Sequence, residues 1–327
     1  MILVLAEHDR GALNDLSLQA LTLGRRLAES LGEPMEAVVV GAEGKPLSDT
    51  LAAYGASKVH VADHEELTDY APAAWAAAVV ELIERTRPSV VLAAGSDRGN
   101  EVMAHVAARL DLPMAANVTE VTPGETYTLT RTRWGGSLLE EATLAGERKL
   151  LTVTPHAVPA KAAEAAGEGA VETFTPSLSE ADLLVRVSDR VQRAGDKLSL
   201  TDAKVVVGGG RGVGSSEGFA ALEELAELLN GAVGCSRVVT SLGWRPHADQ
   251  VGQTGQRIAP DLYIACGISG AIQHMVGCKS AKTLFVINTD PEAPILSQAD
   301  YAIIGDVRQT VPALTAALRP SSGQRAG

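Results

Sequence analysis

The chain has little cysteine, few aromatic residues and a deficit of positive charge, and each shortage excludes a class of protein. Its three cysteines, Cys235, Cys266 and Cys278, form no Cys-x-x-Cys pair, which excludes a disulfide framework and a zinc ribbon and fits a reducing compartment. Aromatic residues make up 3% of the chain, too few for a surface that stacks nucleic-acid bases. The net charge of −12 argues against partners such as DNA, RNA or an anionic membrane surface.

Long apolar runs are also missing. No uninterrupted apolar stretch approaches the roughly 18 residues of a membrane-spanning helix, so direct membrane insertion is not expected. Residues 1–9 have no basic segment and fit a strand, which predicts neither a signal nor a transit peptide and favours a cytoplasmic location. Hydrophobic residues make up 46% and charged residues 21% of the 327 positions, which is ordinary for a globular protein of about two domains.

The first half of the chain alternates short β-branched runs with amphipathic stretches. We expect strands at 2–6, 37–40, 58–62 and 89–93, and helices at 13–31, 72–86 and about 100–110. Such alternation predicts an α/β domain with a mainly parallel sheet and flanking helices on both faces. Two further strands, at 126–130 and 149–154, are expected to join the sheet as antiparallel additions.

A small, polar segment rich in proline and glycine, 159–179, is the best linker candidate. A second alternating block follows, with strands expected at 204–207, 232–235, 262–266, 283–287 and 301–304 and a helix at 219–229. We therefore expect an N-terminal α/β domain over 1–185, a doubly wound C-terminal α/β domain over 190–320, and a disordered tail at 321–327.

Glycines and polar residues follow the expected strands of the second block. Gly208–Gly212, which includes Arg211, follows the first strand, and Ser236 and Arg237 follow the second. Gly267–Gly270 follows the third strand and precedes a helix that carries Gln273 and His274, while Asn288 and Asp306 follow the last two. Because parallel strands end at one edge of their sheet, these residues predict a site for a large anionic cofactor at that edge.

Each element also has a simpler interpretation. Gly208–Gly212 fits neither the GxGxxG nor the Walker A pattern and can be a tight turn, although an arginine beside backbone N–H groups suits a phosphate. Gly267–Gly270 can bind an anion or can end in an ordinary helix cap at Ser269. His274 can be a satisfied histidine, and Asn288 and Asp306 can be turn residues.

The stretch Gln250–Gly255 (QVGQTG) has no periodicity, two glycines and three side chains that can hydrogen-bond. Such a loop suits the edge of a planar heterocycle. The three cysteines are most simply small buried hydrophobic residues.

Taken together, these motifs resemble the electron transfer flavoprotein alpha subunit. The resemblance rests on the order and spacing of GGRG at 209–212, SR at 236–237, QVGQTG at 250–255, LYIA at 262–265, GISGAIQH at 267–274, IN at 287–288, EAPI at 292–295 and ADY at 299–301. It covers about 200–318 closely. The first half is similar more loosely, through Gly95 and the helix that carries VAARL at 106–110.

The resemblance implies that the second domain binds FAD. Arg211 and Ser236 are then expected near the pyrophosphate, Asn288 at a phosphate or the ribitol, and Asp306 at the adenosine end. Arg237 is expected to face the isoalloxazine ring, and the residues expected to line the flavin are Val251, Gly252, Gln253 and Thr254. Those expected to wrap the ring and the phosphates are Ser269, Gly270, Ala271, Ile272, Gln273 and His274. Arg237, the Thr254 hydroxyl near N5 and His274 near O2 are expected to tune the flavin.

Three positions depart from the family pattern: Gly208 stands where serine is common, and Cys266 and Cys278 replace more usual apolar residues. GSDRG at 95–99 follows a strand and opens a helix, and alone it suits a phosphate. Because the family binds no cofactor there, we interpret it as a structural turn.

The family also implies an electron carrier rather than an enzyme, in a heterodimer with a beta subunit that holds AMP. Acyl-CoA and related dehydrogenases donate the electrons, and a quinone oxidoreductase passes them towards the respiratory chain. Two alternatives are a bifurcating or nitrogen-fixation-linked relative, whose partner chain binds a second FAD and oxidises NADH, and a nucleotide-binding module without a redox role.

Overall fold

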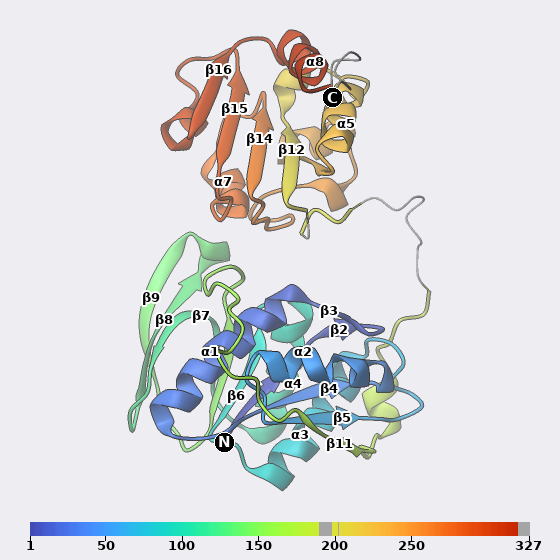
Figure 1. Ribbon diagram of the computed structural model, residues 1–327, viewed down its shortest axis with the longest axis vertical. Coiled ribbons are helices and arrows are strands. Elements are labelled where there is room, and N and C mark those ends of the chain that lie inside the picture. The colour runs from blue at the N-terminus through green and yellow to red at the C-terminus, as the bar shows by residue number, and fades with distance from the viewer. Residues whose placement is uncertain (190–197, 202, 320–327) are drawn as a thin grey trace, which may run out of the picture. The chain divides into compact units, whose positions relative to one another are not determined.

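The chain folds into two compact α/β units, Met1–Val191 and Gln192–Gly327 (Figure 1). The computed structural model describes residues 1–189, 198–201 and 203–319, so the expected tail at 321–327 lies outside the described residues. Among the described helices, none has the length and apolar character needed to cross a membrane.

The first unit is built on a nine-stranded sheet, within residues 1–189, in the order β11-β5-β4-β1-β6-β10-β7-β8-β9. The strands are β1 (Ile2–Leu5), β4 (Met35–Val40), β5 (Lys58–Ala62), β6 (Val90–Ala94), β7 (Met114–Thr122), β8 (Tyr127–Arg133), β9 (Leu138–Leu144), β10 (Lys149–Val153) and β11 (Ala170–Phe174). Neighbours from β11 to β7 pair in parallel, and β8 is antiparallel to both β7 and β9. A short antiparallel pair, β2 (His8–Asp9) and β3 (Ala12–Leu13), follows β1.

Helices cover both faces of this sheet. They are α1 (Asp15–Leu31), α2 (Ser48–Ala53), α3 (Pro72–Thr86) and α4 (Asp97–Leu110). Helix α1 begins after Asn14, whose side chain accepts the Leu16 N–H as an N-cap. It ends at Gly32, whose backbone adopts the left-handed conformation that glycine favours. Pro72 stands in the first turn of α3, where no intrahelical N–H is needed.

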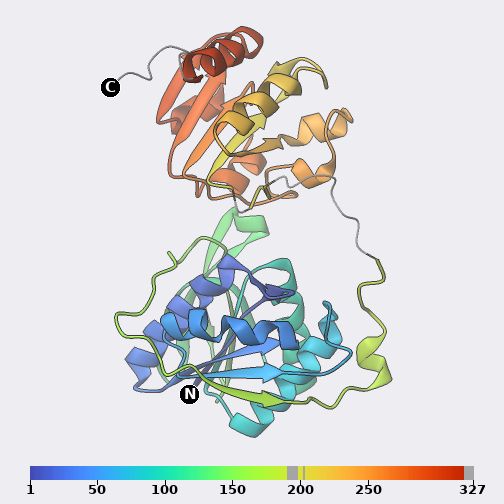
Figure 2. The same cartoon turned by 45° about the vertical axis from the view of Figure 1, so that its right-hand side comes forward.

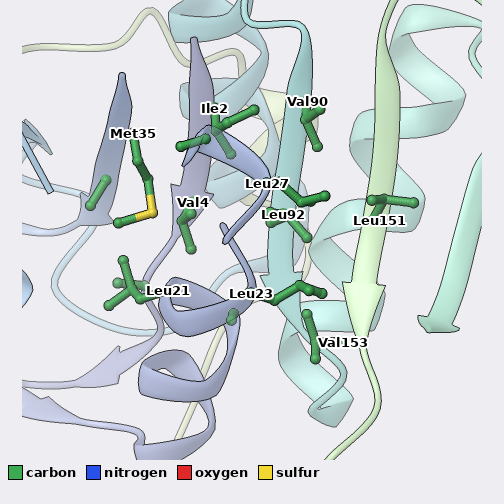
Figure 3. Close-up of a cluster of buried hydrophobic side chains, with 14 of the residues drawn as sticks. Ile2, Val4, Leu21, Leu23, Leu27, Met35, Val90, Leu92, Leu151 and Val153 are labelled. Atoms are coloured by element: carbon green, nitrogen blue, oxygen red, sulfur yellow. The ribbon is translucent and has the colours of Figure 1, made fainter. Parts of the chain in front are cut away.

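The strand residues of the first unit alternate between two apolar cores. Ile2 and Val4 of β1 pack on the face that α1 covers with Leu21, Leu23 and Leu27 (Figure 3). Their neighbours Leu3 and Leu5 belong to the opposite core, which α3 and α4 cover. A strand buried on both faces is apolar at every position, so the continuous run at the start of the chain forms a central strand.

Two expectations for the first unit were wrong. The strand at 149–154, β10, is not an antiparallel addition, because it lies between β6 and β7 and is parallel to both. The proposed linker at 159–179 contains β11, which pairs in parallel with β5 at the sheet edge. Glu172 of β11 binds Lys58 at 3.0 Å and Arg85 at 3.1 Å, so these cations fix the polar face of the edge strand.

The second unit contains a five-stranded parallel sheet, within 198–201 and 203–319, in the order β13-β12-β14-β15-β16. The strands are β12 (Val205–Gly209), β13 (Ala232–Cys235), β14 (Leu262–Cys266), β15 (Leu284–Asn288) and β16 (Tyr301–Ile304). The helices are α5 (Phe219–Leu228), α6 (Arg237–Ser241), α7 (Ile272–Cys278) and α8 (Val307–Leu318).

The sheet of the second unit is doubly wound. Helices α5 and α8 pack side by side on one face (Figure 2), while α7 contributes Met275 and Cys278 to the core on the other face. Strand β12 has β13 on one side and β14 on the other, so the winding direction reverses between β12 and β14. In open α/β sheets, ligands bind beyond the strand ends at such a reversal.

Candidate functional site

A cavity of about 690 Å³ lies beyond the carboxyl ends of β12, β13, β14 and β15, where the winding reverses. Its walls are the segments that follow these strands, together with the loop after 249. Of the predicted site residues, those that line it are Arg211, Ser236, Arg237, Val251, Gly252, Gln253, Thr254, Ser269, Gly270, Ala271, Gln273, His274 and Asn288. The volume falls within the roughly 300–1,000 Å³ typical of sites for small ligands and cofactors.

The floor of the cavity is formed by two glycine loops packed backbone against backbone. The Gly210 N–H donates to the Cys266 carbonyl at 2.8 Å, and the Gly212 N–H donates to the Gly267 carbonyl at 3.1 Å. A Cβ atom on Gly210 would lie 2.2 Å from the Gly267 carbonyl oxygen. Glycine is therefore required for the loops after β12 and β14 to meet, which brings Arg211 and Ser269 to one rim.

Two cations stand at the cavity. Arg211 and Arg237 are exposed, and neither forms a salt bridge with the described carboxylates. Ser236, at the start of α6, is 9% exposed, and its Oγ is buried with no hydrogen-bond partner among the described residues. Since buried hydroxyls are normally satisfied, the free cations and the unsatisfied Ser236 indicate an anionic ligand.

The loop from Gln250 to Gln256 is held by its own backbone and by one buried amide. The Val251 N–H donates to the Cys235 carbonyl at 2.8 Å, and the Gln253 N–H donates to the Gln273 carbonyl at 2.7 Å. Gln250 is 2% exposed; its Nε2 donates to Thr254 Oγ1 at 2.9 Å, and its Oε1 accepts from Thr240 Oγ1 at 2.8 Å. The Thr254 hydroxyl is thereby fixed in the wall.

His274 lies in the first turn of α7 and is 6% exposed. Its Nε2 is 2.8 Å from the Tyr263 hydroxyl, and its Nδ1 is buried without a hydrogen-bond partner in the described part of the chain. Burial lowers the pKa of His274 to about 4. The imidazole is therefore neutral near pH 7, so it brings no charge to the cavity wall.

Asn288 uses both ends of its amide to hold the wall. Its Nδ2 donates to the Ile268 carbonyl at 2.9 Å, and its Oδ1 accepts the Asp290 N–H at 3.0 Å. These bonds join the loop after β15 to the loop after β14, so Asn288 shapes the cavity in addition to lining it.

Two predicted site residues lie outside the cavity as the structure describes it. Asp306 is the N-cap of α8: it accepts the Arg308 N–H at 2.9 Å and pairs with Arg308 Nη2 at 2.7 Å. Ile272 opens α7 with 72% of its surface exposed. The carboxylate of Asp306 is thus engaged by its own helix, and the expected contacts of Asp306 and Ile272 with a cofactor stay predictions.

The sequence reasoning did not single out several lining residues as site residues. They are Gly212, Val238, Gln250, Gly267, Ile268, Thr289, Asp290 and Ala293. Gln250 opened a loop that was already of interest, and Thr289 and Asp290 follow Asn288 directly, so adjacency could have found these three. Nothing in the local pattern marks Ala293, which reaches the cavity only through the fold.

The glycine-containing turn at 95–99 in the first unit contacts groups of the chain itself. Ser96 caps α4 by accepting the Gly99 N–H at 2.9 Å, and its hydroxyl donates to the buried carboxylate of Glu7. A Cβ atom on Gly95 would lie 2.5 Å from the Val153 carbonyl oxygen. A side-chain carboxylate thus stands where an anion would approach the helix N-terminus.

Comparison with known proteins agrees with this arrangement. Residues 2–179 match the family model described as the electron transfer flavoprotein domain, and residues 199–279 match the electron transfer flavoprotein FAD-binding domain. The chain is 40% identical to an electron transfer flavoprotein subunit alpha from Mycobacterium tuberculosis, over 98% of this chain and 99% of that protein.

Two further relatives cover nearly the whole chain. Identity is 35% to the electron transfer flavoprotein subunit alpha of Megasphaera elsdenii, over 98% of this chain and 97% of that protein. Identity is 37% to a protein named FixB from Clostridium saccharobutylicum, over 96% of this chain and 94% of that protein. Given the two family-model matches and this near-complete coverage, the chain belongs to the electron transfer flavoprotein alpha-subunit family.

Proposed function

We propose that this chain binds FAD in the cavity of its second unit and carries electrons as the alpha subunit of a heterodimer. The observation that carries the proposal is the cavity of about 690 Å³ at the winding reversal, lined by most residues of the family motifs. Two unpaired arginines, a glycine floor and a polar loop suit a long ligand with phosphates at one end and a planar ring at the other. Bound FAD supplies reversible one-electron chemistry.

The residues divide by chemistry along the cavity. Arg211, beside the backbone N–H groups of the glycine floor, is proposed to hold the pyrophosphate, with the unsatisfied Ser236 hydroxyl close by. Asn288 is proposed to contact a phosphate or the ribitol. Arg237, Thr254 and His274 are proposed to face the ring and to set its electron affinity.

The family membership supports a proposal for the partners. We propose that an electron transfer flavoprotein beta subunit binds this chain and holds AMP, and that acyl-CoA and related dehydrogenases donate the electrons. A quinone oxidoreductase then accepts them, in a route that begins in the cytoplasm with fatty acid beta-oxidation and leads towards the respiratory chain. The chain is proposed to turn over no substrate of its own. The net charge of −12 supports docking to other proteins in solution.

The visible spectrum of the chain co-purified with its beta subunit tests the proposal. A flavin absorbance that bleaches on reduction, with FAD identified by mass spectrometry, is the expected result. A colourless heterodimer that releases only AMP or ATP would instead identify a nucleotide-binding module without a redox role.

A second candidate is the bifurcating or nitrogen-fixation-linked type. It is retained because identity to the relative named FixB, 37%, is in the same range as identity to the relatives named subunit alpha, 35% and 40%. One flavin per heterodimer supports the ordinary carrier. Two flavins, together with bleaching by NADH alone, would support the alternative.

A further inference from the structure

A tyrosine that does not line the cavity is hydrogen-bonded to a histidine that does. Tyr263, on β14, has no exposed surface, and its hydroxyl is 2.8 Å from Nε2 of His274. The two rings are stacked, with centroids 6.0 Å apart and planes inclined by 30°. Both rings are buried, so an unsatisfied hydrogen-bonding group on either of them is costly.

Counting donors and acceptors in this pair selects one tautomer of the imidazole. If Nε2 carried the proton, the Tyr263 hydroxyl would accept it, and its own proton would be left without an acceptor among the described residues. The Nδ1 lone pair, which has no partner there either, would be a second unsatisfied group. If Nδ1 carries the proton, Tyr263 donates to Nε2 and only Nδ1–H is left, so fewer buried groups are unsatisfied.

The surroundings of the pair support a neutral ring. The titratable groups that face Tyr263 are the thiols of Cys235, Cys266 and Cys278, from β13, β14 and α7. Burial raises the pKa of each thiol to about 12, so all three are uncharged. Burial likewise disfavours the imidazolium and outweighs the opposing effect of the Val251 backbone, which does not reach Nδ1 with normal hydrogen-bond geometry.

A glycine on the neighbouring strand makes room for the tyrosine. Gly208 of β12 lies beside β14, and a Cβ atom there would be 2.2 Å from the Tyr263 hydroxyl oxygen and 2.6 Å from a ring carbon. Contacts this short require the ring to move. The glycine that departs from the common serine therefore allows Tyr263 to reach His274.

We infer that Tyr263 is a positioning residue of the cofactor site: its hydroxyl donates to Nε2 of His274 and holds the imidazole as the neutral tautomer protonated on Nδ1. A second proton on the ring would have to enter at Nε2 and displace the tyrosine proton, which would then be buried without an acceptor. Tyr263 thus opposes a positive charge at this wall. The consequence for the flavin rests on the proposed function; the tautomer itself does not.

The tautomer is measured directly by nitrogen NMR of the heterodimer carrying 15N-labelled histidine, with the His274 signals assigned by their loss in His274→Gln. In the native protein Nδ1 is expected to be protonated and Nε2 to be a hydrogen-bond acceptor. In Tyr263→Phe the tautomer ratio is expected to shift by roughly tenfold towards Nε2–H, the factor that corresponds to one ordinary hydrogen bond, and the ring is expected to titrate at higher pH. A protonated Nε2 in the native protein overturns the inference.

Two further variants keep the test decisive if the phenylalanine variant folds poorly. Gly208→Ala keeps the Tyr263 hydroxyl but moves it away from His274. The same shift in the His274 signals is therefore expected. Tyr301→Phe is the matched control, because Tyr301 is 65% exposed on β16 of the same sheet, and it should leave the His274 signals unchanged. Unchanged signals in both Gly208→Ala and Tyr263→Phe contradict the inference.

The flavin provides a second readout. Tyr263→Phe is expected to change the first reduction potential of the flavin-loaded heterodimer, and this change should disappear when His274→Gln is already present. A change that persists in the His274→Gln background shows that Tyr263 does not act through His274. Absence of flavin altogether refutes the proposed function, whereas the NMR result still decides the tautomer.

Discussion

Acidification is expected to destabilise the second unit through His274. The imidazole has a usual pKa of 6.5, and burial lowers it to about 4 in the folded protein. Between these two values the unfolded chain binds a proton at this position and the folded chain does not. The stabilising free energy is therefore fully present above the unfolded pKa, falls as the pH falls below 6.5, and reaches its lower limit below about 4.

The two pKa values determine the size of the effect. Between about pH 7.5 and about pH 5, the free energy of unfolding falls by ~2 kcal/mol because of this one residue. The decrease approaches ~3 kcal/mol near the pKa of His274 in the folded protein. His274→Gln replaces the imidazole with an amide that does not titrate and can still accept from Tyr263. The stability difference between the native protein and this variant should therefore change by about 2 kcal/mol across that pH range.

The assay is urea unfolding of the flavin-free heterodimer at both pH values, followed by hydrogen-exchange mass spectrometry of peptides from 262–278. These peptides report on β14 and α7 rather than on the first unit. His247→Gln is the matched control, because it makes the same substitution at an exposed histidine of the same unit. A His274→Gln variant whose stability falls with pH in parallel with the native protein would refute a buried, neutral His274.

Three other outcomes are expected. Arg237→Ala should lower the first reduction potential of the bound flavin by tens of millivolts. About 170 mV is an upper bound, because water screens an exposed guanidinium. An unchanged potential in a potentiometric titration would remove Arg237 from the ring site. Gly212→Ala should destabilise the second unit by about 1–3 kcal/mol, since its Cβ atom would lie 2.7 Å from the Gly267 Cα. Equal melting temperatures of the variant and the native protein would contradict the required close approach of the two loops. The chain without its beta subunit should retain less flavin and melt at a lower temperature, because a ligand stabilises only the state that binds it. Equal flavin occupancy with and without the partner would contradict a shared site.

Local pattern determined many elements of this protein. The strands Lys58–Ala62, Ala232–Cys235, Leu262–Cys266 and Tyr301–Ile304 and the helix Pro72–Thr86 have the bounds that their residues predict. Apolar runs form these strands, which are largely buried except for the exposed edge strand Tyr301–Ile304, and glycine, proline and polar residues end them. Much of the cavity lining could likewise be predicted, because many of its residues follow strand ends in a parallel sheet and all such ends lie at one edge.

Tertiary structure decided what depends on neighbours distant in the chain. The placement of β10 between β6 and β7 and the pairing of β11 with β5 are long-range choices that no local pattern contains. The pairing of Asp306 with Arg308 at the start of α8 is likewise visible only in the folded protein.

The protonation state of His274 belongs to the same group. A histidine in a glycine-rich motif can be charged or neutral, and its sequence neighbours do not distinguish the two. Only the folded protein shows that the ring is enclosed, that Tyr263 stands at Nε2, and that Gly208 on another strand leaves space for that tyrosine. Burial and hydrogen bonding set the charge of an ionisable group, and both arise where β12, β14 and α7 pack together.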